Sequence, residues 1–410
     1  MNTMTYDVVI IGGGLAGLST AATIAQGSDA AIAIVEERGI GSNNPTPMTF
    51  TDVVERFSLV DYVTARYRRF TFHSVLGNKS SHVYDTSPLV TFDYRRACGE
   101  LLRRAQLAGN VTLIRDRAMQ LRRGFGDGWQ VCLAGGQEIT ASLLVDASGC
   151  SLFTTHALDL PRPRMFSHCF GQTFSKCAVP DLEEAFFLAP SDRFGDGGGW
   201  LYPLFDGRVS FGYATLSTAA DYPAQMMKER YYRALREFMP YADWLADAQL
   251  DHVEMGTIPV CPPRSFVYDG LMLVGDAAGQ ATIWSCMGSE PSLVGGQLAG
   301  QTVIKAHRRQ DYSLAVLENY QRQWNQMYRR IYRQGALLAP VSWRQGEINW
   351  NRQIPLVQQL TPTQMLARLR INWPLLPWWK IALICAYDWA GRARRGLLAR
   401  LRGQYGQRSV

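Results

Sequence analysis

The chain has 410 residues, a length sufficient for two domains and an additional segment. Hydrophobic residues make up 47% of the chain and charged residues 19%, a composition that excludes an intrinsically disordered protein. The net charge of +7 is unevenly distributed, because the last 19 residues contain six arginines and no acidic residue.

The cysteines and histidines give no sign of a metal site. None of the eight cysteines forms a Cys-x-x-Cys pair or lies near a histidine at zinc-binding spacing. We therefore expect reduced thiols in a cytoplasmic protein that binds no metal. An apolar strand begins at Tyr6 without a basic segment before it, and no run of about 18 apolar residues follows, so we predict neither a signal peptide nor a transmembrane helix.

The first 150 residues predict an α/β unit that begins with a strand, a glycine turn, a helix and a second strand. Apolar β-branched runs indicate buried strands, and amphipathic periodicity indicates helices. The elements expected in chain order are a strand at 6–11, a helix at 15–26, a strand at 30–35, a helix at 93–107, a β-meander over 112–142 and a strand at 143–146.

The middle of the chain changes character, because aromatic residues and glycines alternate over residues 151–262. This pattern favours a mainly antiparallel sheet with one helix near 223–238. A buried strand at 271–274 and a helix at 291–306 then return to the earlier pattern, and the chain beyond residue 310 is predicted to be helical.

The expected fold class is α/β, with α+β character in part. A Rossmann-like domain that binds a dinucleotide would be assembled from two separate segments and interwoven with a mainly antiparallel substrate domain. The expected division is residues 1–150 and 262–310 for the first domain, 151–261 for the second, and 311–410 for a helical C-terminal region.

The clearest motif is Gly12-Gly13-Gly14-Leu15-Ala16-Gly17, which has the form G-x-G-x-x-G. The first glycine allows a tight turn, the second lets the backbone approach a pyrophosphate, and the third lets the helix pack on the strand. The helix N-terminus then directs N–H groups at the phosphates. Glu36, which ends the second strand next to Glu37, can accept hydrogen bonds from the ribose hydroxyls of an adenosine. The glycines between two buried strands therefore predict a dinucleotide site.

A second motif distinguishes a flavin dinucleotide from a nicotinamide one. A buried strand ends in Gly275-Asp276, where an aspartate can accept a hydrogen bond from a ribityl hydroxyl, and NAD has no ribityl chain. The N-terminus of the helix expected at 291–306 can stabilise negative charge on a reduced flavin. The sequence therefore predicts FAD as the cofactor.

These motifs together resemble the flavoprotein group that contains p-hydroxybenzoate hydroxylase, geranylgeranyl reductases, lycopene cyclases and flavin-dependent halogenases. The resemblance is carried by the glycine motif, by Asp146-Ala147-Ser148-Gly149 and by Gly275 to Gly279, and it spans nearly the first 300 residues. It implies that Asp146 belongs to the cofactor site in a DxxG turn and that Arg95, or Arg96 beside it, lies near the FAD pyrophosphate. A solvated helix face is the alternative for Arg95.

Within this group the geranylgeranyl reductase branch gives the best match. Its cavity motif Y-x-W-x-F-P is partly present as Gly198-Gly199-Trp200-Leu201-Tyr202-Pro203, followed after eight residues by Gly212. Trp200 and Tyr202 alternate on one strand face, so with Pro203 and Trp284 they are candidates for an apolar substrate pocket. Ordinary packing in the core of the sheet is the alternative.

The reductases also have a flavin-side loop of the form S-G-x-G, which reads Ser285-Cys286-Met287-Gly288 in this chain. The resemblance implies that Met287 and Gly288 contact the flavin and that the Cys286 thiol lies close to it. Cys286 is then a candidate proton relay, although a small buried hydrophobe is the more common role of a free cysteine. Residues 41–47 replace the Pro-Cys-Gly-Gly stretch of the reductases, so the cysteine of that stretch is absent. The halogenase motif W-x-W-x-I-P is also absent, and halogenation is therefore not favoured.

The C-terminal segment combines aromatic and basic residues. Four tryptophans lie between Trp373 and Trp389, and the arginine-rich stretch follows directly. Tryptophan beside a basic helix is typical of a lipid headgroup interface, so we expect peripheral contact with the inner face of a membrane through residues 373–402. A helical cap packed on the protein is the alternative, and a nucleic acid partner is not expected.

The motifs and the resemblance predict an FAD-dependent oxidoreductase. NAD(P)H would reduce the flavin transiently, and the flavin would pass a hydride to a hydrophobic substrate, an isoprenoid or a related lipid. Three alternatives stay open because a shared fold does not fix the reaction. They are a flavin monooxygenase or halogenase acting on an apolar or aromatic substrate, a non-redox enzyme similar to lycopene cyclase, and a binding module in which FAD is structural.

Overall fold

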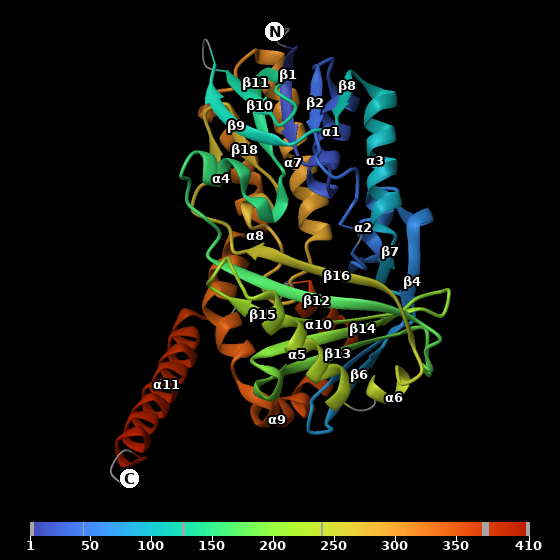
Figure 1. Ribbon diagram of the computed structural model, residues 1–410, viewed down its shortest axis with the longest axis vertical. Helices are drawn as coiled ribbons and strands as arrows, with labels where there is room; N and C mark the ends of the chain where they lie inside the picture. The colour runs from blue at the N-terminus through green and yellow to red at the C-terminus, as the bar shows by residue number, and fades with distance from the viewer. Residues whose placement is uncertain (1–3, 44, 125–127, 239–240, 371–376, 407–410) are drawn as a thin grey trace.

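The computed structural model describes residues 4–43, 45–124, 128–238, 241–370 and 377–406. Two large sheets occupy opposite ends of an elongated body (Figure 1). Helix α8 (Leu314–Trp343) contacts strands of both sheets, so it joins the two ends of the molecule.

The first sheet has the architecture of a dinucleotide-binding domain. Its strand order is β17-β18-β11-β1-β2-β8, in which the pairs from β18 to β8 are parallel, and β9 and β10 extend it antiparallel from β11. β1 is buried from Val8 to Ile11, as expected for a parallel strand covered on both faces. The strand bounds are β1 Met4–Ile11, β2 Ile32–Val35, β8 Val111–Ile114, β9 Ala118–Arg123, β10 Trp129–Leu133, β11 Glu138–Asp146, β17 Val267–Tyr268 and β18 Leu271–Leu273.

Three helices pack beside this sheet, and their close approach positions the site. α1 (Leu15–Gly27) contacts both α3 (Tyr94–Ala108) and α7 (Ser289–Arg309). A Cβ atom at Gly296 of α7 would lie 2.5 Å from the Ala16 carbonyl oxygen, so only glycine permits this contact. The first turn of α1 is therefore held against the N-terminal half of α7.

The second sheet has seven strands in the order β16-β12-β15-β14-β13-β5-β6, and every pair except β13–β5 is antiparallel. α5 (Ala224–Glu237) packs against one face, where it buries Phe170 and Phe211. Successive side chains of a strand point to opposite faces of the sheet, so the residues next to Phe170 and Phe211 on their strands face the interior of the molecule. The strand bounds are β5 Arg69–His73, β6 Lys79–Val83, β12 Met165–Ser175, β13 Glu184–Ser191, β14 Gly197–Pro203, β15 Val209–Ser217 and β16 Gln249–Val260.

The second sheet draws on more of the chain than the sequence analysis expected. It was expected to come from residues 151–261, but β5 and β6 come from residues 69–83, which had been assigned to the dinucleotide domain. The side chains of β5 explain its place, because the Phe70 ring lies 4.6 Å from Phe187 and the Phe72 ring 5.5 Å from Trp350. These contacts join residues more than 100 positions apart, which local sequence patterns do not reveal.

Shorter elements connect the two sheets. A three-stranded sheet has the order β3-β7-β4, and its strands come between β2 and β8 of the first sheet along the sequence. The bounds are β3 Met48–Phe50, β4 Val63–Tyr67 and β7 Leu89–Phe92 for the strands, α2 Thr51–Arg56, α4 Phe153–Ala157 and α6 Tyr241–Trp244 for the helices, and Val60–Tyr62, Gly149–Ser151, Asp192–Phe194 and Gly275–Ala278 for 3-10 turns.

The C-terminal region is helical, as the sequence analysis predicted. After α8 come α9 (Gly346–Gln358), which contacts β6 and β13, and α10 (Pro362–Leu369), which begins with a capping box at Thr361. α11 (Trp378–Gly406) contacts α8 and extends away from the body (Figure 1). No helix in the described ranges is long and apolar enough to cross a membrane. Trp373 lies outside the described residues.

The predicted fold class is confirmed: a parallel Rossmann-like sheet is combined with an antiparallel sheet and C-terminal helices. Most predicted elements fall within a few residues of their observed bounds. The β-meander consists of β9, β10 and β11, because β8 instead pairs parallel with β2.

Candidate active site

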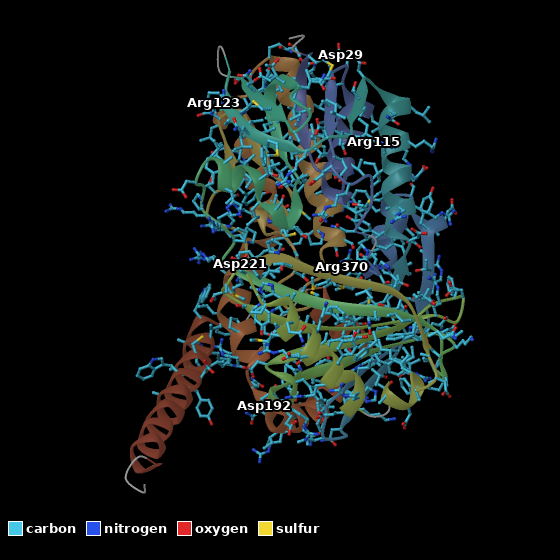
Figure 2. All side chains as sticks on the ribbon, viewed as in Figure 1. Asp29, Arg115, Arg123, Asp192, Asp221 and Arg370 are labelled. Atoms are coloured by element: carbon cyan, nitrogen blue, oxygen red, sulfur yellow. The ribbon has the colours of Figure 1, made fainter. Side chains whose placement is uncertain are left out.

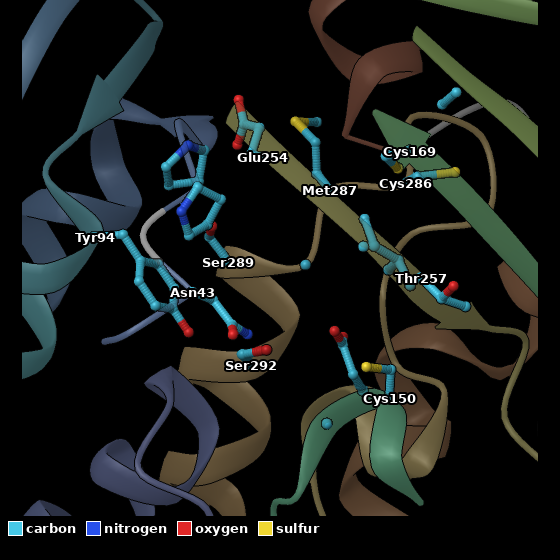
Figure 3. Close-up of a pocket in the computed structure, with 18 of the residues that line it drawn as sticks. Asn43, Tyr94, Cys150, Cys169, Glu254, Thr257, Cys286, Met287, Ser289 and Ser292 are labelled. Carbon is cyan, nitrogen blue, oxygen red and sulfur yellow. The ribbon is translucent and has the colours of Figure 1, made fainter. Parts of the chain in front are cut away.

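A cavity of about 1280 Å³ lies between the two sheets. Its walls come from the β1–α1 turn, the loop after β2, the start of α7, the inner face of the seven-stranded sheet, and helices α9 and α10. Residues from both ends of the molecule therefore meet in one chamber (Figure 3).

The β1–α1 turn forms one end of this chamber, and three of its glycines have distinct steric roles. Gly12 has φ +109°, and a Cβ atom there would lie 2.2 Å from the Ala147 carbonyl oxygen. Gly14 is the N-cap of α1 and lines the cavity together with Leu15 and Ala16. Gly17 lies outside the lining, because a Cβ atom there would lie 2.2 Å from the Gly12 oxygen, so this glycine lets α1 pack on β1.

The acidic residues after β2 lie beside this turn. The carboxylate of Glu36 lines the cavity and accepts hydrogen bonds from the backbone N–H groups of Gly13 and Arg38, both at 2.8 Å. Glu37 is exposed at the rim, 4.0 Å from the Arg117 guanidinium. Glu36 is thus oriented toward the phosphate turn, as a residue that binds an adenosine ribose would be.

Asp276 is the clearest sign that a polar ligand belongs in the chamber. Gly275 before it has φ +66° and approaches Ala16 of α1. The Oδ1 atom of Asp276 is buried and has no hydrogen-bond partner among the described residues. Burial raises the pKa of this carboxyl to about 7. A buried carboxylate oxygen without a donor is costly, so the site fits a ligand that brings hydroxyl groups, such as the ribityl chain of FAD.

Five predicted site residues lie outside the cavity lining, namely Gly17, Gly275, Asp146, Arg95 and Pro203. The carboxylate of Asp146 accepts hydrogen bonds from the backbone N–H groups of Ser148 and Thr154, at 2.9 and 2.8 Å, so it holds the turn after β11 together. Arg95 is exposed on the first turn of α3 and does not reach the chamber. Pro203 ends β14, where its carbonyl oxygen accepts a hydrogen bond from the Tyr67 hydroxyl at 2.8 Å.

The inner face of the seven-stranded sheet forms the apolar wall. Trp200 and Tyr202 line the cavity from β14 with their rings 6.3 Å apart in a stacked arrangement. Phe187 of β13 packs on Tyr202 at 5.6 Å between ring centroids. Trp284, from the loop before α7, also lines the chamber. These aromatic groups create a surface suited to an apolar substrate.

The loop before α7 has an unusual backbone at Cys286. This residue has φ +53°, in the left-handed region that favours glycine, and glycine is the residue that the reductase motif has there. Burial raises the pKa of the Cys286 thiol to about 11, so the thiol stays protonated near neutral pH. Met287 and Gly288 also line the cavity. The conformation supports the alignment with the S-G-x-G loop, while the pKa argues against a thiolate at this position.

Several cavity residues were missed by the sequence analysis. Tyr94 begins α3 with its hydroxyl next to Gly14, and burial raises the pKa of this phenol well above its ordinary value. Glu254 of β16 also lines the chamber (Figure 3). Nothing local marks either residue, because each reaches the chamber only through pairing and packing with distant segments.

An ion-pair cluster holds the wall formed by α10. Arg370, which follows α10, pairs with Asp52 of α2 at 2.6 Å and with Glu290 of α7 at 3.0 Å. Its guanidinium also lies 4.8 Å from the centre of the Phe50 ring. Figure 2 shows Arg370 at the middle of the molecule, between the two ends. The cluster therefore fixes the helix that closes the cavity.

Comparisons with known proteins agree with this geometry. The chain matches the family described as lycopene cyclase protein over residues 7–333. It is 28% identical to digeranylgeranylglycerophospholipid reductase 2 of Methanopyrus kandleri over 202 residues, which cover 48% of this chain and only half, 50%, of that relative. It is 25% identical to digeranylgeranylglycerophospholipid reductase 3 of Methanosphaera stadtmanae over 344 residues, which cover 78% of this chain and 82% of that relative.

A solved structure shares the fold almost throughout. The geranylgeranyl bacteriochlorophyll reductase-like protein of Thermoplasma acidophilum superposes with a TM-score of 0.79 at 17% identity, over 92% of this chain and 98% of that one. The family match covers far more than half of the chain, and the predicted resemblance is thereby confirmed. The chain belongs to the lycopene cyclase protein family.

Proposed function

We propose that this protein transfers a hydride from NAD(P)H, through bound FAD, to a double bond of an isoprenoid or related lipid. The observation that carries the proposal is the single cavity, which joins the dinucleotide turns to the aromatic face of the seven-stranded sheet. Its volume of about 1280 Å³ exceeds the roughly 300–1,000 Å³ of an ordinary ligand site, so a lipid has room beside a dinucleotide.

Different cavity residues would bind different parts of the dinucleotide. The turn at Gly12 and Gly14 would hold the pyrophosphate, Glu36 the adenosine ribose, and Asp276 the ribityl chain. Once bound, FAD supplies hydride transfer at its N5 atom. The chain itself would orient the apolar substrate on Trp200.

The relatives support a lipid as the substrate class. Both are named digeranylgeranylglycerophospholipid reductases, so their substrates are isoprenoid chains on a glycerophospholipid. The family match to lycopene cyclases favours a second candidate, a non-redox cyclisation of an isoprenoid. The two reactions differ in that a reductase consumes NAD(P)H in proportion to product, and a cyclase does not.

α11 supports peripheral contact with a lipid surface. Trp379, Leu383 and Tyr387 of this helix are exposed by 61%, 62% and 84%. Asp388 pairs with Arg344, which directly follows α8, and Ile381 is buried, so Asp388 and Ile381 lie on the side of α11 that packs on the body. Exposed aromatic groups on a basic helix suit a headgroup interface, and we place the enzyme at the cytoplasmic face of a membrane.

Anaerobic reoxidation tests the proposed function. The purified flavoprotein is reduced with NADPH or NADH under argon and mixed with digeranylgeranylglycerophospholipid in detergent micelles, and flavin absorbance near 450 nm is followed. We expect reoxidation by the lipid without oxygen, with one double bond saturated for each flavin oxidised. Reoxidation only by air would contradict a reductase, and product formed without any flavin reoxidation would establish the cyclase.

A further inference from the structure

The inner face of the seven-stranded sheet contains one carboxyl group that binding of a dinucleotide does not explain. Five carboxyl residues line the cavity. Glu36, Glu37 and Asp116 lie at the adenosine end, and Asp276 lies at the flavin motif. The remaining one, Glu254, is on β16, in the same sheet as the aromatic residues of the apolar wall.

Strand register places Glu254 opposite Trp200 on this wall. Glu254 pairs with Gly171 of β12, Gly171 pairs with Gly212 of β15, and Gly212 pairs with Trp200 of β14. Residues paired directly across strands share one face of a sheet. The four residues therefore form a row in which a carboxyl and an indole are separated by two glycines.

The glycines leave a groove that the two large side chains enter from opposite sides. A Cβ atom at Gly171 would lie 3.0 Å from Cγ of Glu254, and one at Gly212 would lie 2.0 Å from Cζ2 of Trp200. Glu254 thus leans over one glycine and the Trp200 ring leans over the other. A flat apolar group resting on the indole would meet the carboxyl at its edge.

Glu254 is also tied to the dinucleotide half of the molecule. Its Oε2 atom accepts a hydrogen bond from the backbone N–H of Thr46 at 3.0 Å, and Oε1 accepts one from the Ser210 hydroxyl at 3.3 Å. Thr46 belongs to the cavity loop after β2, beside Pro45 and Pro47. The carboxyl is consequently fixed at the boundary between the two walls.

We propose that Glu254 is the acid that protonates the substrate double bond in the chamber. The inference rests on the proposed reductase function. Saturation of a C=C bond requires a hydride on one carbon and a proton on the other. The hydride comes from the reduced cofactor, the O–H bond of Glu254 breaks as the new C–H bond forms, and the resulting carboxylate takes a proton from water.

The surroundings of Glu254 favour its protonated form. Burial raises the pKa of this carboxyl, and the hydrogen bond from Thr46 opposes that shift without cancelling it. The titratable groups that face the carboxyl on the inner side of the sheet are His252 on β16, Cys169 on β12 and Tyr202 on β14, while Tyr231 of α5 interacts with it from the other side of the sheet. A group that must donate a proton near neutral pH benefits from such a shift.

The substitution Glu254→Gln separates proton donation from packing. Glutamine keeps the size and the acceptor oxygen for Thr46 but cannot donate an acidic proton. We expect the variant to retain FAD and to be reduced by NAD(P)H at the wild-type rate, while reoxidation by the lipid slows about 10²–10⁴-fold. Asp251→Asn, on an exposed carboxyl of the same strand, is the matched control and should behave as wild type.

Two further measurements distinguish a catalytic acid from a structural residue. The wild-type rate of lipid-dependent reoxidation should fall as pH rises through the raised pKa of Glu254, and the rate of the E254Q variant should not. In lipid-free protein, the infrared difference between wild type and E254Q should show a protonated carboxyl band that titrates above the ordinary glutamate pKa of about 4.3.

The outcomes also separate this inference from the proposed function. Lipid reoxidation of wild type with an unchanged rate in E254Q would overturn the role of Glu254 and leave the reductase intact. Failure of wild type to react with any lipid would overturn both. An infrared band at the ordinary pKa would exclude Glu254 as the acid whatever the substrate.

Discussion

Replacing Asp276 with asparagine should stabilise the flavin-free protein, and the gain should increase with pH. The buried carboxyl has an ordinary pKa of 3.8 in an unfolded chain and a pKa raised to about 7 by desolvation in the folded one. The folded protein therefore binds a proton that the unfolded chain has already released. For an acid whose pKa is raised by folding, the folded state carries no penalty below the pKa of the unfolded chain, and it loses stability as pH rises toward the pKa of the folded protein.

The two pKa values fix the size of the effect. Linkage gives a penalty on the folded state of about 1.7 kcal/mol at pH 5 and about 4 kcal/mol at pH 8. Asparagine has no charge to desolvate, so the D276N variant should gain these amounts relative to wild type. Water that enters the open chamber reduces the penalty, so we expect a measured gain between about 2 and 4 kcal/mol at pH 8.

Urea unfolding of the flavin-free proteins at both pH values measures the gain. Asp247→Asn removes an exposed carboxyl and is the control, with an expected change below about 0.5 kcal/mol. Affinity for FAD should change in the opposite direction, by about 3- to 30-fold weaker binding in D276N, because a neutral amide accepts a hydrogen bond less strongly than a carboxylate. An equal gain at pH 5 and pH 8 would refute the reasoning, since the penalty would then not arise from charge.

Two further substitutions and one deletion test other parts of the structure. Gly12→Ala should abolish FAD binding, measured as flavin content. Gly39→Ala is the control and should retain FAD, with the free energy of unfolding lowered by about 1–2 kcal/mol. Both glycines have φ near +100°, but of the two only Gly12 has backbone within reach of an added Cβ atom. Arg370→Met should lower the free energy of unfolding by about 1–3 kcal/mol in urea, because Glu290 loses its partner; an unchanged value would show that the cluster is not stabilising. Deleting residues 377–410 should reduce sedimentation with anionic vesicles, and unchanged sedimentation would leave α11 as a packing element.

The sequence predicted those site residues whose role is set by local backbone chemistry. Gly12 is recognisable because a tight turn after a buried strand needs its positive φ, and Asp276 because it follows a strand that returns to the same sheet. Asp146 satisfies a local pattern equally well, yet its carboxylate is used by the backbone of its own turn. A motif thus indicates where the chain turns, but not which way a side chain points.

The residues that the sequence did not predict depend on pairing between distant strands. Glu254 reads as one polar position in an alternating strand, and only the register with Gly171 and Gly212 shows that it faces Trp200. The strand that contains Phe72 joins the substrate sheet through a parallel pair with β13, across more than 100 residues. Such contacts carry no local signal, because they arise from burial in the assembled sheet.

A cyclase and a reductase would need the same chemistry from the inner face of the seven-stranded sheet. Each adds a proton to an isoprenoid double bond, and the faces of Trp200 and Tyr202 can stabilise the positive charge that develops on carbon through their quadrupoles. The reactions differ in how that charge is removed, by a hydride in a reductase and by loss of a proton in a cyclase. E254Q should therefore disable either reaction, so it identifies the acid and not the reaction. The flavin identifies the reaction, because its reoxidation in proportion to product occurs only when a hydride leaves it.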